Sequence, residues 1–159
     1  MMAQAAPIVV TTIGYEATTV PAFLDALREA GVELLVDVRA VASSRRPGFA
    51  KTALAANLEG AGIGYVHLRG LGTPADGRAA ARAGHHAEMQ RIFRAHLETD
   101  KAEADMERLV ELVRGGKRLA LLCFEADPAH CHRTLVAAAL AKRVPIDVRH
   151  LTPWREERD

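Results

Sequence analysis

The sequence contains few cysteines, little net charge and no long apolar run, and each shortage excludes a class of protein. Two cysteines in 159 residues are too few for a disulfide framework, so we expect reduced thiols and a cytoplasmic location. A net charge of +1 gives no bulk attraction for nucleic acid or acidic membranes. No stretch approaches the roughly 18 consecutive apolar residues of a membrane span, and the first residues lack a signal-peptide pattern. The sequence therefore predicts a soluble protein without a membrane partner.

The composition predicts one packed domain. Hydrophobic residues make up 49% of the chain and the mean hydropathy is -0.02, which argues against disorder. We expect a flexible N-terminus over 1–7, a single domain over 8–152, and a charged tail over 153–159 that frays. The sequence has no internal repeat and no Walker or dinucleotide-binding fingerprint.

Buried strands alternate with amphipathic helices along this domain. Apolar or β-branched runs predict strands at 8–13, 34–38, 63–68, 118–123 and 146–151, of which the last suits a sheet edge. The spacing of apolar residues predicts helices at 19–30, 51–60, 85–99, 101–114 and from 128 to before Pro145. Residues 69–83 have no clean period and form either a loop or a partial helix. This order predicts a single-domain, three-layer α/β/α fold with a mostly parallel sheet of about five strands.

A parallel sheet of this kind collects chemically capable residues at one edge. In open parallel sheets, ligands bind outside the carboxyl ends of the strands. The residues that follow those ends here are Tyr15 and Glu16, Asp37 and Arg39, His67, and the segment 123–133. We therefore expect the functional site at this edge.

The segment 123–133 carries the strongest chemical signal. The dipeptide 127–128, Asp-Pro, predicts a helix start, with Cys131 and His132 in the first two turns. The helix dipole and nearby cations would lower the pKa of the Cys131 thiol, which suits a nucleophile with His132 as proton carrier. The alternative is a small residue that packs the helix on the sheet, and this alternative is favoured for Cys123. The candidate catalytic residues are Cys131, His132, Glu125 and Cys123.

Arginine side chains at the strand ends predict an anion site. Arg133 and Arg39 could clamp a phosphate or carboxylate, although each could instead form an ion pair, for example Arg39 with Asp37. The loop around Arg46 adds a basic rim, but Phe49 alone is too little for base stacking. The candidate ligand-binding residues are Arg133, Arg39, Arg46, Tyr15, Glu16, Asp37 and His67.

Cysteine and histidine cluster in this segment, but the sequence argues against a metal site. His130, Cys131 and His132 are consecutive, and consecutive residues of one helical turn point in different directions. Structural zinc usually takes pairs of ligands two to four residues apart in both halves of the site. We therefore expect no metal and no required cofactor.

Several of these stretches together resemble one family. Residues 12–16, 35–39, 44–49, 67–72, 122–125 and 131–133 are similar to the small bacterial and archaeal proteins known as domain of unknown function 488. The resemblance spans residues 8 to about 140 and implies one compact α/β domain with its site at the same strand ends, but it implies no reaction. Phe124 and Ala17 depart from the pattern, in which a smaller residue and a glycine are usual.

The sequence leaves two functions open. The first is a small cytoplasmic enzyme, a hydrolase or group transferase, that acts on a phosphate-bearing or otherwise anionic ligand such as a nucleotide. The second is a non-catalytic module that binds nucleic acid or a protein partner through the same crevice and the loop of Arg45 and Arg46. Thiol reactivity separates the two, because a catalytic Cys131 would react at neutral pH and a packing cysteine would not.

Overall fold

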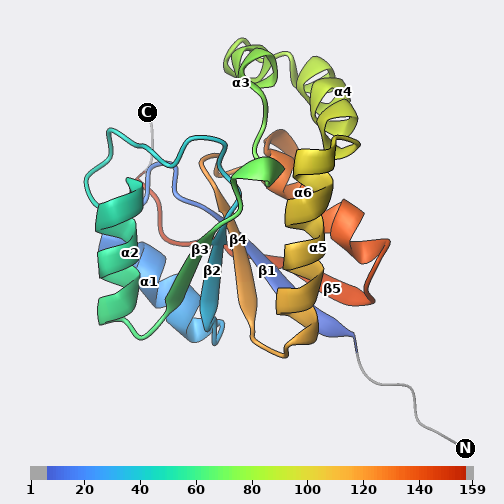
Figure 1. Cartoon of the computed structure of the whole chain (residues 1–159). Coiled ribbons are helices and arrows are strands. Elements are labelled where there is room, and N and C mark those ends of the chain that lie inside the picture. Colours follow the sequence, from blue (N-terminus) through green and yellow to red (C-terminus); the bar gives the residue numbers. More distant parts are fainter. Residues whose placement is uncertain (1–6, 157–159) are drawn as a thin grey trace, which may run out of the picture.

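The computed structural model describes residues 7–156, which form a five-stranded sheet with all neighbouring strands parallel (Figure 1). The strands are β1 (Ile8–Gly14), β2 (Leu34–Asp37), β3 (Gly64–His67), β4 (Leu119–Cys123) and β5 (Ile146–His150). Their order across the sheet is β3-β2-β4-β1-β5. The register places Gly14 opposite Cys123 and Asp37 opposite Leu122. The carboxyl ends of the three central strands therefore lie level at one edge.

Helices cover both faces of the sheet, which confirms the predicted three-layer fold. The helices are α1 (Val20–Glu29), α2 (Lys51–Gly60), α3 (Ala75–Arg82), α4 (His86–Leu97), α5 (Asp100–Arg114) and α6 (His132–Ala141). One apolar core, with Phe23 and Leu54, lies under α1 and α2. The other, with Phe93, Met106 and Val136, lies under α4, α5 and α6 on the opposite face. Figure 1 shows the two groups of helices on either side of the sheet.

The central strand β4 has the apolar composition that a strand covered on both faces needs. All of its residues are buried. Leu119, Leu121 and Cys123 contribute to one core, while Ala120 and Leu122 contribute to the other. The last strand, β5, is half-buried and exposed in turn and lies at the sheet edge, as its alternating pattern predicts.

The segment that the sequence left between loop and helix is largely helical. A short 3₁₀ turn, η1 (Arg69–Leu71), precedes α3, which packs against α4. Both helices project beyond the carboxyl edge of the sheet (Figure 1). Gly84 connects them with a φ of 80°, a conformation that glycine adopts without strain. The inward positions of α3 are occupied by the small residues Gly77 and Ala80, so no large apolar side chain marks its buried face in the sequence.

The start of α6 differs from the prediction. Asp127 caps a 3₁₀ turn, η2 (Pro128–His130), by accepting from the Ala129 N–H over 2.9 Å. Cys131 then has an extended backbone, with φ −122° and ψ 140°, and α6 begins only at His132. Cys131 therefore lies at the boundary of the helix and not inside its first turns.

The chain after β5 is held against the turn between β1 and α1. Nη2 of Arg155 donates to the carbonyl oxygen of Gly14 over 2.8 Å, and the N–H of Glu156 donates to that of Ala17 over 2.8 Å. Arg155 and Glu156, which belong to the tail expected to fray, therefore have specific backbone contacts in the structure. Of the flexible N-terminus expected at 1–7, only residue 7 is among the described residues. Residues 157–159 of the tail also lie outside them. Within 7–156, no helix has the length and apolar character needed to cross a membrane.

Candidate functional site

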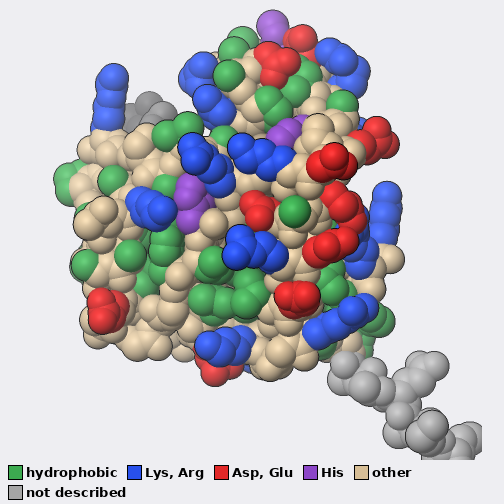
Figure 2. Space-filling view, in the orientation of Figure 1, with side chains coloured by type: hydrophobic (Ala, Val, Ile, Leu, Met, Phe, Trp, Pro, Cys, Tyr) green, Lys and Arg blue, Asp and Glu red, His purple; other side chains and the backbone are tan. Residues whose placement is uncertain are grey.

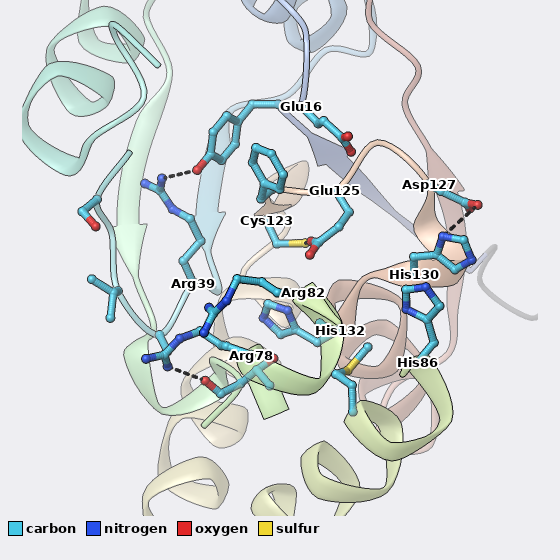
Figure 3. A pocket seen from close by; sticks show the side chains of 18 residues that line it. Glu16, Arg39, Arg78, Arg82, His86, Cys123, Glu125, Asp127, His130 and His132 are labelled. Atoms are coloured by element: carbon cyan, nitrogen blue, oxygen red, sulfur yellow. Dashed lines mark hydrogen bonds and ion pairs between the residues drawn. The ribbon is translucent and has the colours of Figure 1, made fainter. Parts of the chain in front are cut away.

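A cavity of about 600 Å³ opens at the carboxyl ends of the strands (Figure 3). Its walls come from the loops after β1, β2 and β4 and from α3 and α4. The edge at which the sequence places the site therefore carries a hollow of ligand size. Six of the candidate residues line it: Tyr15, Glu16, Arg39, Cys123, Glu125 and His132.

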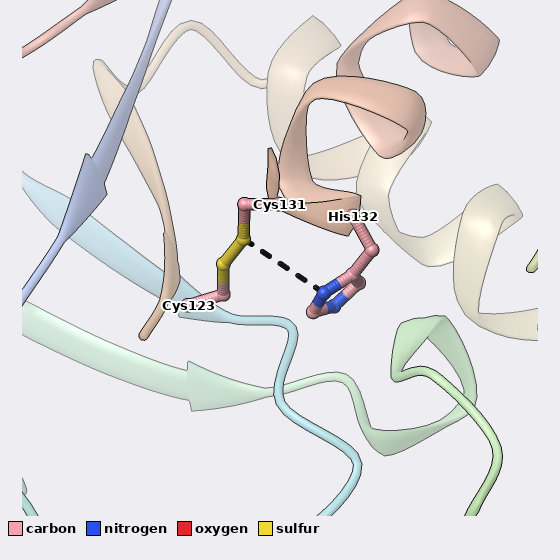
Figure 4. A group of neighbouring side chains, drawn as sticks. All are labelled: Cys123, Cys131 and His132. Atoms are coloured by element: carbon pink, nitrogen blue, oxygen red, sulfur yellow. Dashed lines mark hydrogen bonds between the residues drawn. A yellow bond between two sulfur atoms is a disulfide. The ribbon is translucent and has the colours of Figure 1, made fainter. Parts of the chain in front are cut away.

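The two cysteines meet at the floor of this cavity. The structure pairs Cys123 with Cys131 as a disulfide (Figure 4), although their Cα atoms are 7.1 Å apart, more than the usual range of about 4.4–6.8 Å. The sequence leads us to expect reduced thiols instead. The two cysteines are eight residues apart in the sequence. They meet because the η2 turn brings Cys131 back onto the end of β4, which the sequence does not predict. Both cysteines are buried, but only Cys123 lines the cavity. Of the two cysteines, Cys123 is therefore the one that contributes to the cavity lining.

His132 presents one ring nitrogen to the cysteines. Its Nε2 atom lies 2.6 Å from the carbonyl oxygen of Val38, which can only accept, so Nε2 carries the hydrogen. Nδ1 is then the unprotonated nitrogen, and it lies 3.9 Å from Sγ of Cys131. Burial lowers the pKa of His132 to about 4. At neutral pH the ring is uncharged and its Nδ1 lone pair faces the sulfur atoms.

Two glutamates bring carboxylates to the cavity. Oε2 of Glu125 lies 3.4 Å from Sγ of Cys123. Burial raises the pKa of Glu125 above its ordinary value, and the nearby charge of Glu16 adds to this effect. Oε1 of Glu16 accepts from the N–H of Ala126 over 2.9 Å, which ties the loops after β1 and β4 together. Glu125 is therefore placed to exchange a proton with the Cys123 sulfur or with a bound ligand.

Basic side chains of α3 and α4 form a wall that the sequence prediction missed. Arg78 and Arg82 are four residues apart on α3, and both line the cavity together with His86 (Figure 3). Nη1 of Arg78 donates to the carbonyl oxygen of Thr73 over 2.8 Å. Nδ1 of His86 is buried and has no hydrogen-bond partner among the described residues. The spacing of the two arginines was visible in the sequence, but it signals one face only once α3 is known to be a helix.

His86 also contacts a second histidine of the cavity. Its ring stacks on that of His130 with centroids 4.0 Å apart. Nδ1 of His130 lies 3.5 Å from Oδ2 of Asp127, and all three residues line the cavity. His85, the preceding residue, is exposed.

Arg39 belongs to a buried network beside the cavity. It pairs with both carboxylate oxygens of Asp37, at 2.9 and 2.8 Å, and donates to the carbonyl of Phe49 at 2.8 Å and the hydroxyl of Tyr15 at 3.3 Å. Burial opposes its charge, but Asp37 holds the pKa of Arg39 above its ordinary value. The Tyr65 hydroxyl donates to Asp37 over 2.6 Å, and burial together with this bond raises the pKa of Tyr65. Asp37 is fully buried and does not line the cavity. Its contacts are those of an ion pair with Arg39, the alternative to ligand binding that the sequence left open.

Arg133 is fully buried and also lies outside the cavity lining. Its Nε donates to Thr12 Oγ1 over 3.1 Å, its Nη1 donates to the Glu125 carbonyl over 2.6 Å, and Nη1 lies 3.6 Å from Sγ of Cys123. A Cβ at Gly14 would lie 3.0 Å from Nη1 and would collide with the Glu125 backbone, so glycine permits this close packing. Burial lowers the pKa of Arg133 to about 10, which leaves it charged at neutral pH. Its contacts support the loop after β4, and its role as an anion clamp stays a prediction.

Two further candidates contact the protein backbone away from the cavity. Nη2 of Arg46 donates to the carbonyl oxygen of Thr18, and Nε2 of His67 lies 2.7 Å from the carbonyl oxygen of Arg39. Neither side chain is among those that line the cavity. Their contacts fix the loops that follow β1 and β2.

Basic and acidic side chains are interspersed on the face drawn in Figure 2, where no single sign dominates. This agrees with the net charge of +1. The cavity lining is mixed as well, with the basic side chains of Arg39, Arg78 and Arg82 and the acidic side chains of Glu16, Glu125 and Asp127 (Figure 3).

Together these features define a single three-layer α/β domain with a mixed basic and acidic cavity at the carboxyl ends of a parallel sheet. The family described as "Domain of unknown function DUF488" matches residues 19–140, and the chain belongs to this family. A search of the curated proteins and a search of the solved structures found no match. The family description supplies no reaction, so a function has to be argued from the chemistry of the cavity.

Proposed function

We propose that the protein is a small enzyme that carries out hydrolysis or group transfer on an anionic ligand, with a phosphate-bearing ligand such as a nucleotide as the main candidate. The observation that carries this proposal is the pairing of groups in one cavity. Arg78 and Arg82 supply positive charge from α3, and Cys123 with Glu125 supplies reactive groups at the floor. A cytoplasmic location suits the proposal because thiols stay reduced there.

The basic wall suits a phosphate. Guanidinium groups bind phosphate oxygens in pairs of parallel hydrogen bonds, and Arg78 and Arg82 lie on the same face of α3. The buried, unpartnered Nδ1 of His86 offers a further polar contact. Phe124 lines the same cavity with 41% of its surface exposed and packs edge-on against Tyr15 at 5.2 Å. An exposed aromatic ring beside an arginine wall is suited to the base and the phosphates of a nucleotide.

The floor suits nucleophilic chemistry when the cysteines are reduced. The Cys123 thiol gives its proton to Glu125, whose Oε2 lies 3.4 Å away, and the thiolate attacks the electrophilic atom of the ligand. A sulfur–ligand bond forms, and the leaving group departs with the proton held by Glu125. Water or a second substrate then breaks the sulfur–ligand bond. Burial raises the pKa of Glu125, which makes its carboxylate a better base toward the thiol and lets it return the proton to the leaving group.

The test is calorimetric titration of the reduced protein with inorganic phosphate and a panel of nucleotides, followed by an assay for turnover. Arg82→Ala should weaken binding by about 10-fold or more, the loss of charge-assisted hydrogen bonds. Arg91→Ala is the matched control, because Arg91 is 73% exposed on α4 and contacts Glu88 instead of the cavity. Glu125→Gln should retain binding and lose turnover. Equal affinities for Arg82→Ala and Arg91→Ala would contradict the assignment of the anion site.

A second candidate is a non-catalytic module that binds nucleic acid, for which the loop after β2 is the relevant surface. Val41 and Ser43 of this loop line the cavity, Val41 is 54% exposed, and Arg45 is exposed a few residues further on. Oligonucleotide binding that falls steeply with salt and is weakened by Arg45→Ala would favour this candidate. Binding that responds to Arg82→Ala and not to Arg45→Ala would favour the enzyme.

A further inference from the structure

Three potential metal ligands lie together at the floor of the cavity. Sγ of Cys123, Sγ of Cys131 and Nδ1 of His132 are all within 4.8 Å of one another (Figure 4). All three residues are buried. Between residues 7 and 156 no other group of three such side chains is gathered as closely. We propose that, when the two cysteines are reduced, this group binds a zinc ion.

The backbone removes the objection that the sequence raised. Consecutive residues diverge when they share a helical turn, but Cys131 is extended and His132 is the first residue of α6. Their side chains can therefore approach one point, and Cys123 reaches the same point from the end of β4. His130 takes no part, since its ring packs on His86 and lies near Asp127. The ligands therefore come from two elements, with one cysteine on the strand and a Cys-His pair at the helix start.

The orientation of His132 is that of a supported metal ligand. A histidine that binds a metal through one nitrogen usually donates its other N–H to a carbonyl or carboxylate oxygen. Nε2 of His132 makes this contact with the Val38 carbonyl, at 2.6 Å. Nδ1 is left with its lone pair directed toward Cys131 Sγ, 3.9 Å away.

The separation of the two cysteine backbones leaves room for an ion. Their Cα atoms are 7.1 Å apart. Disulfides usually join Cα atoms about 4.4–6.8 Å apart. Two thiolates on a tetrahedral zinc, each with a bond of about 2.3 Å, lie about 3.8 Å from one another. Reduced side chains at this backbone separation can therefore accept zinc between the sulfur atoms.

The charges around the group also suit zinc. Binding forms two zinc–sulfur bonds and releases the two thiol protons, so the ion and its two thiolates are neutral together. Arg133 Nη1, 3.6 Å from Cys123 Sγ, favours the thiolate, and Oε2 of Glu125 lies 3.4 Å from the same sulfur. The carboxylate can serve as the fourth ligand or leave that position to water. Cys123 and His132 line the cavity, so this fourth position faces the ligand space, as in catalytic Cys₂His zinc sites.

The zinc site rests on ligand geometry and does not require the anionic ligand of the proposed function. Where both hold, Cys123 is a zinc ligand and a zinc-bound water replaces it as the attacking group. The role of Arg78 and Arg82 in binding the anion is unchanged. Loss of anion binding with zinc binding intact would reject the proposed function alone.

The experiment is a titration of reduced, metal-free protein with Co²⁺ as a spectroscopic probe, followed by displacement with Zn²⁺. We expect one ion per chain, thiolate-to-cobalt charge-transfer absorption and the visible bands of tetrahedral cobalt. Bound zinc should protect both cysteines from alkylation, as mapped by peptide mass. His130→Ala is the matched control and should bind as the wild type does. Cys131→Ser should lower the affinity by at least about 100-fold.

Cobalt uptake and alkylation of the wild-type protein test the zinc site even if the Cys131→Ser variant fails to fold. Reduced wild-type protein that takes up no cobalt, or takes it up without thiolate absorption, would overturn the proposal. Alkylation of Cys123 and Cys131 at equal rates with and without zinc would overturn it too. Protein oxidised to the Cys123–Cys131 disulfide should bind no cobalt, and binding of equal strength in that form would place the ion elsewhere.

Discussion

The Nε2–H of His132 donates to the carbonyl oxygen of Val38 over 2.6 Å and so joins the start of α6 to the end of β2. The ring is buried beside Phe93, whose centroid lies 5.2 Å away in an edge-on arrangement. One bond therefore fixes both the tautomer of the histidine and the position of the loop that carries Arg39. The contact therefore holds His132 of the cavity lining next to the segment that leads into Arg39.

The burial of His132 predicts that the free energy of unfolding falls in mild acid. Burial lowers the pKa of His132 to about 4, against an ordinary value of 6.5. As the pH falls between these values, the unfolded chain binds a proton that the folded chain excludes, so the free energy of unfolding decreases. The loss should be about 2 kcal/mol between about pH 7 and pH 5, as measured by urea unfolding of reduced, metal-free protein.

His132→Gln is the control for this pH dependence. The glutamine amide can still donate to Val38 but does not titrate. The difference in stability between wild type and variant should shrink as the pH falls toward 5. A difference that stays constant over this range would show that another group causes the acid sensitivity.

The buried pair of Asp37 and Arg39 predicts a large loss of stability when its charge balance is broken. Asp37 is fully buried and accepts from Arg39 and from Tyr65. Asp37→Asn would leave the Arg39 guanidinium buried without its counter-charge, which costs about 3–5 kcal/mol. The measurement is urea unfolding at neutral pH, with Tyr65→Phe as a milder test of the single hydrogen bond.

A surface pair provides the matched control. Glu103 and Arg143 form a two-bond ion pair with distances of 2.7 and 2.6 Å, and both side chains are well exposed. Solvent and salt screen such pairs, so Glu103→Gln should change the stability far less than Asp37→Asn. Similar effects of the two substitutions would mean that Asp37 is not an essential partner of Arg39.

The elements that the sequence predicts well are those with a strong local signal. The apolar run of β4 is buried on both faces, and the alternating pattern of β5 places it at the sheet edge. Alternation of strands and helices then requires parallel pairing, which puts Tyr15, Arg39 and Cys123 at one edge. The location of the cavity follows from these facts alone.

The contacts inside the site could not be predicted, because they depend on side chains brought together from distant segments. The partners of Arg133 are Thr12 and the backbone of the loop after β4, and only the folded structure shows that these fill its hydrogen-bonding capacity. The basic wall of Arg78 and Arg82 stands on a helix whose buried positions are small residues, so no large apolar side chain marks its inward face in the sequence. The extended backbone of Cys131 interrupts the segment after Asp127, for which the sequence predicts one continuous helix.

Ala17 provides the last prediction, in the turn between β1 and α1. Its φ is 58°, the left-handed region that favours glycine, and the resemblance to the family led us to expect glycine here. A non-glycine residue in this region costs about 1–2 kcal/mol, of which the greater freedom of glycine in the unfolded chain offsets about 0.5–1. Ala17→Gly should therefore raise the free energy of unfolding by about 0.5–1 kcal/mol. Ala104→Gly, at an exposed position inside α5, should lower it by a similar amount. Urea unfolding of the two variants gives shifts of opposite sign if the backbone of Ala17 is left-handed, and of the same sign if it is not.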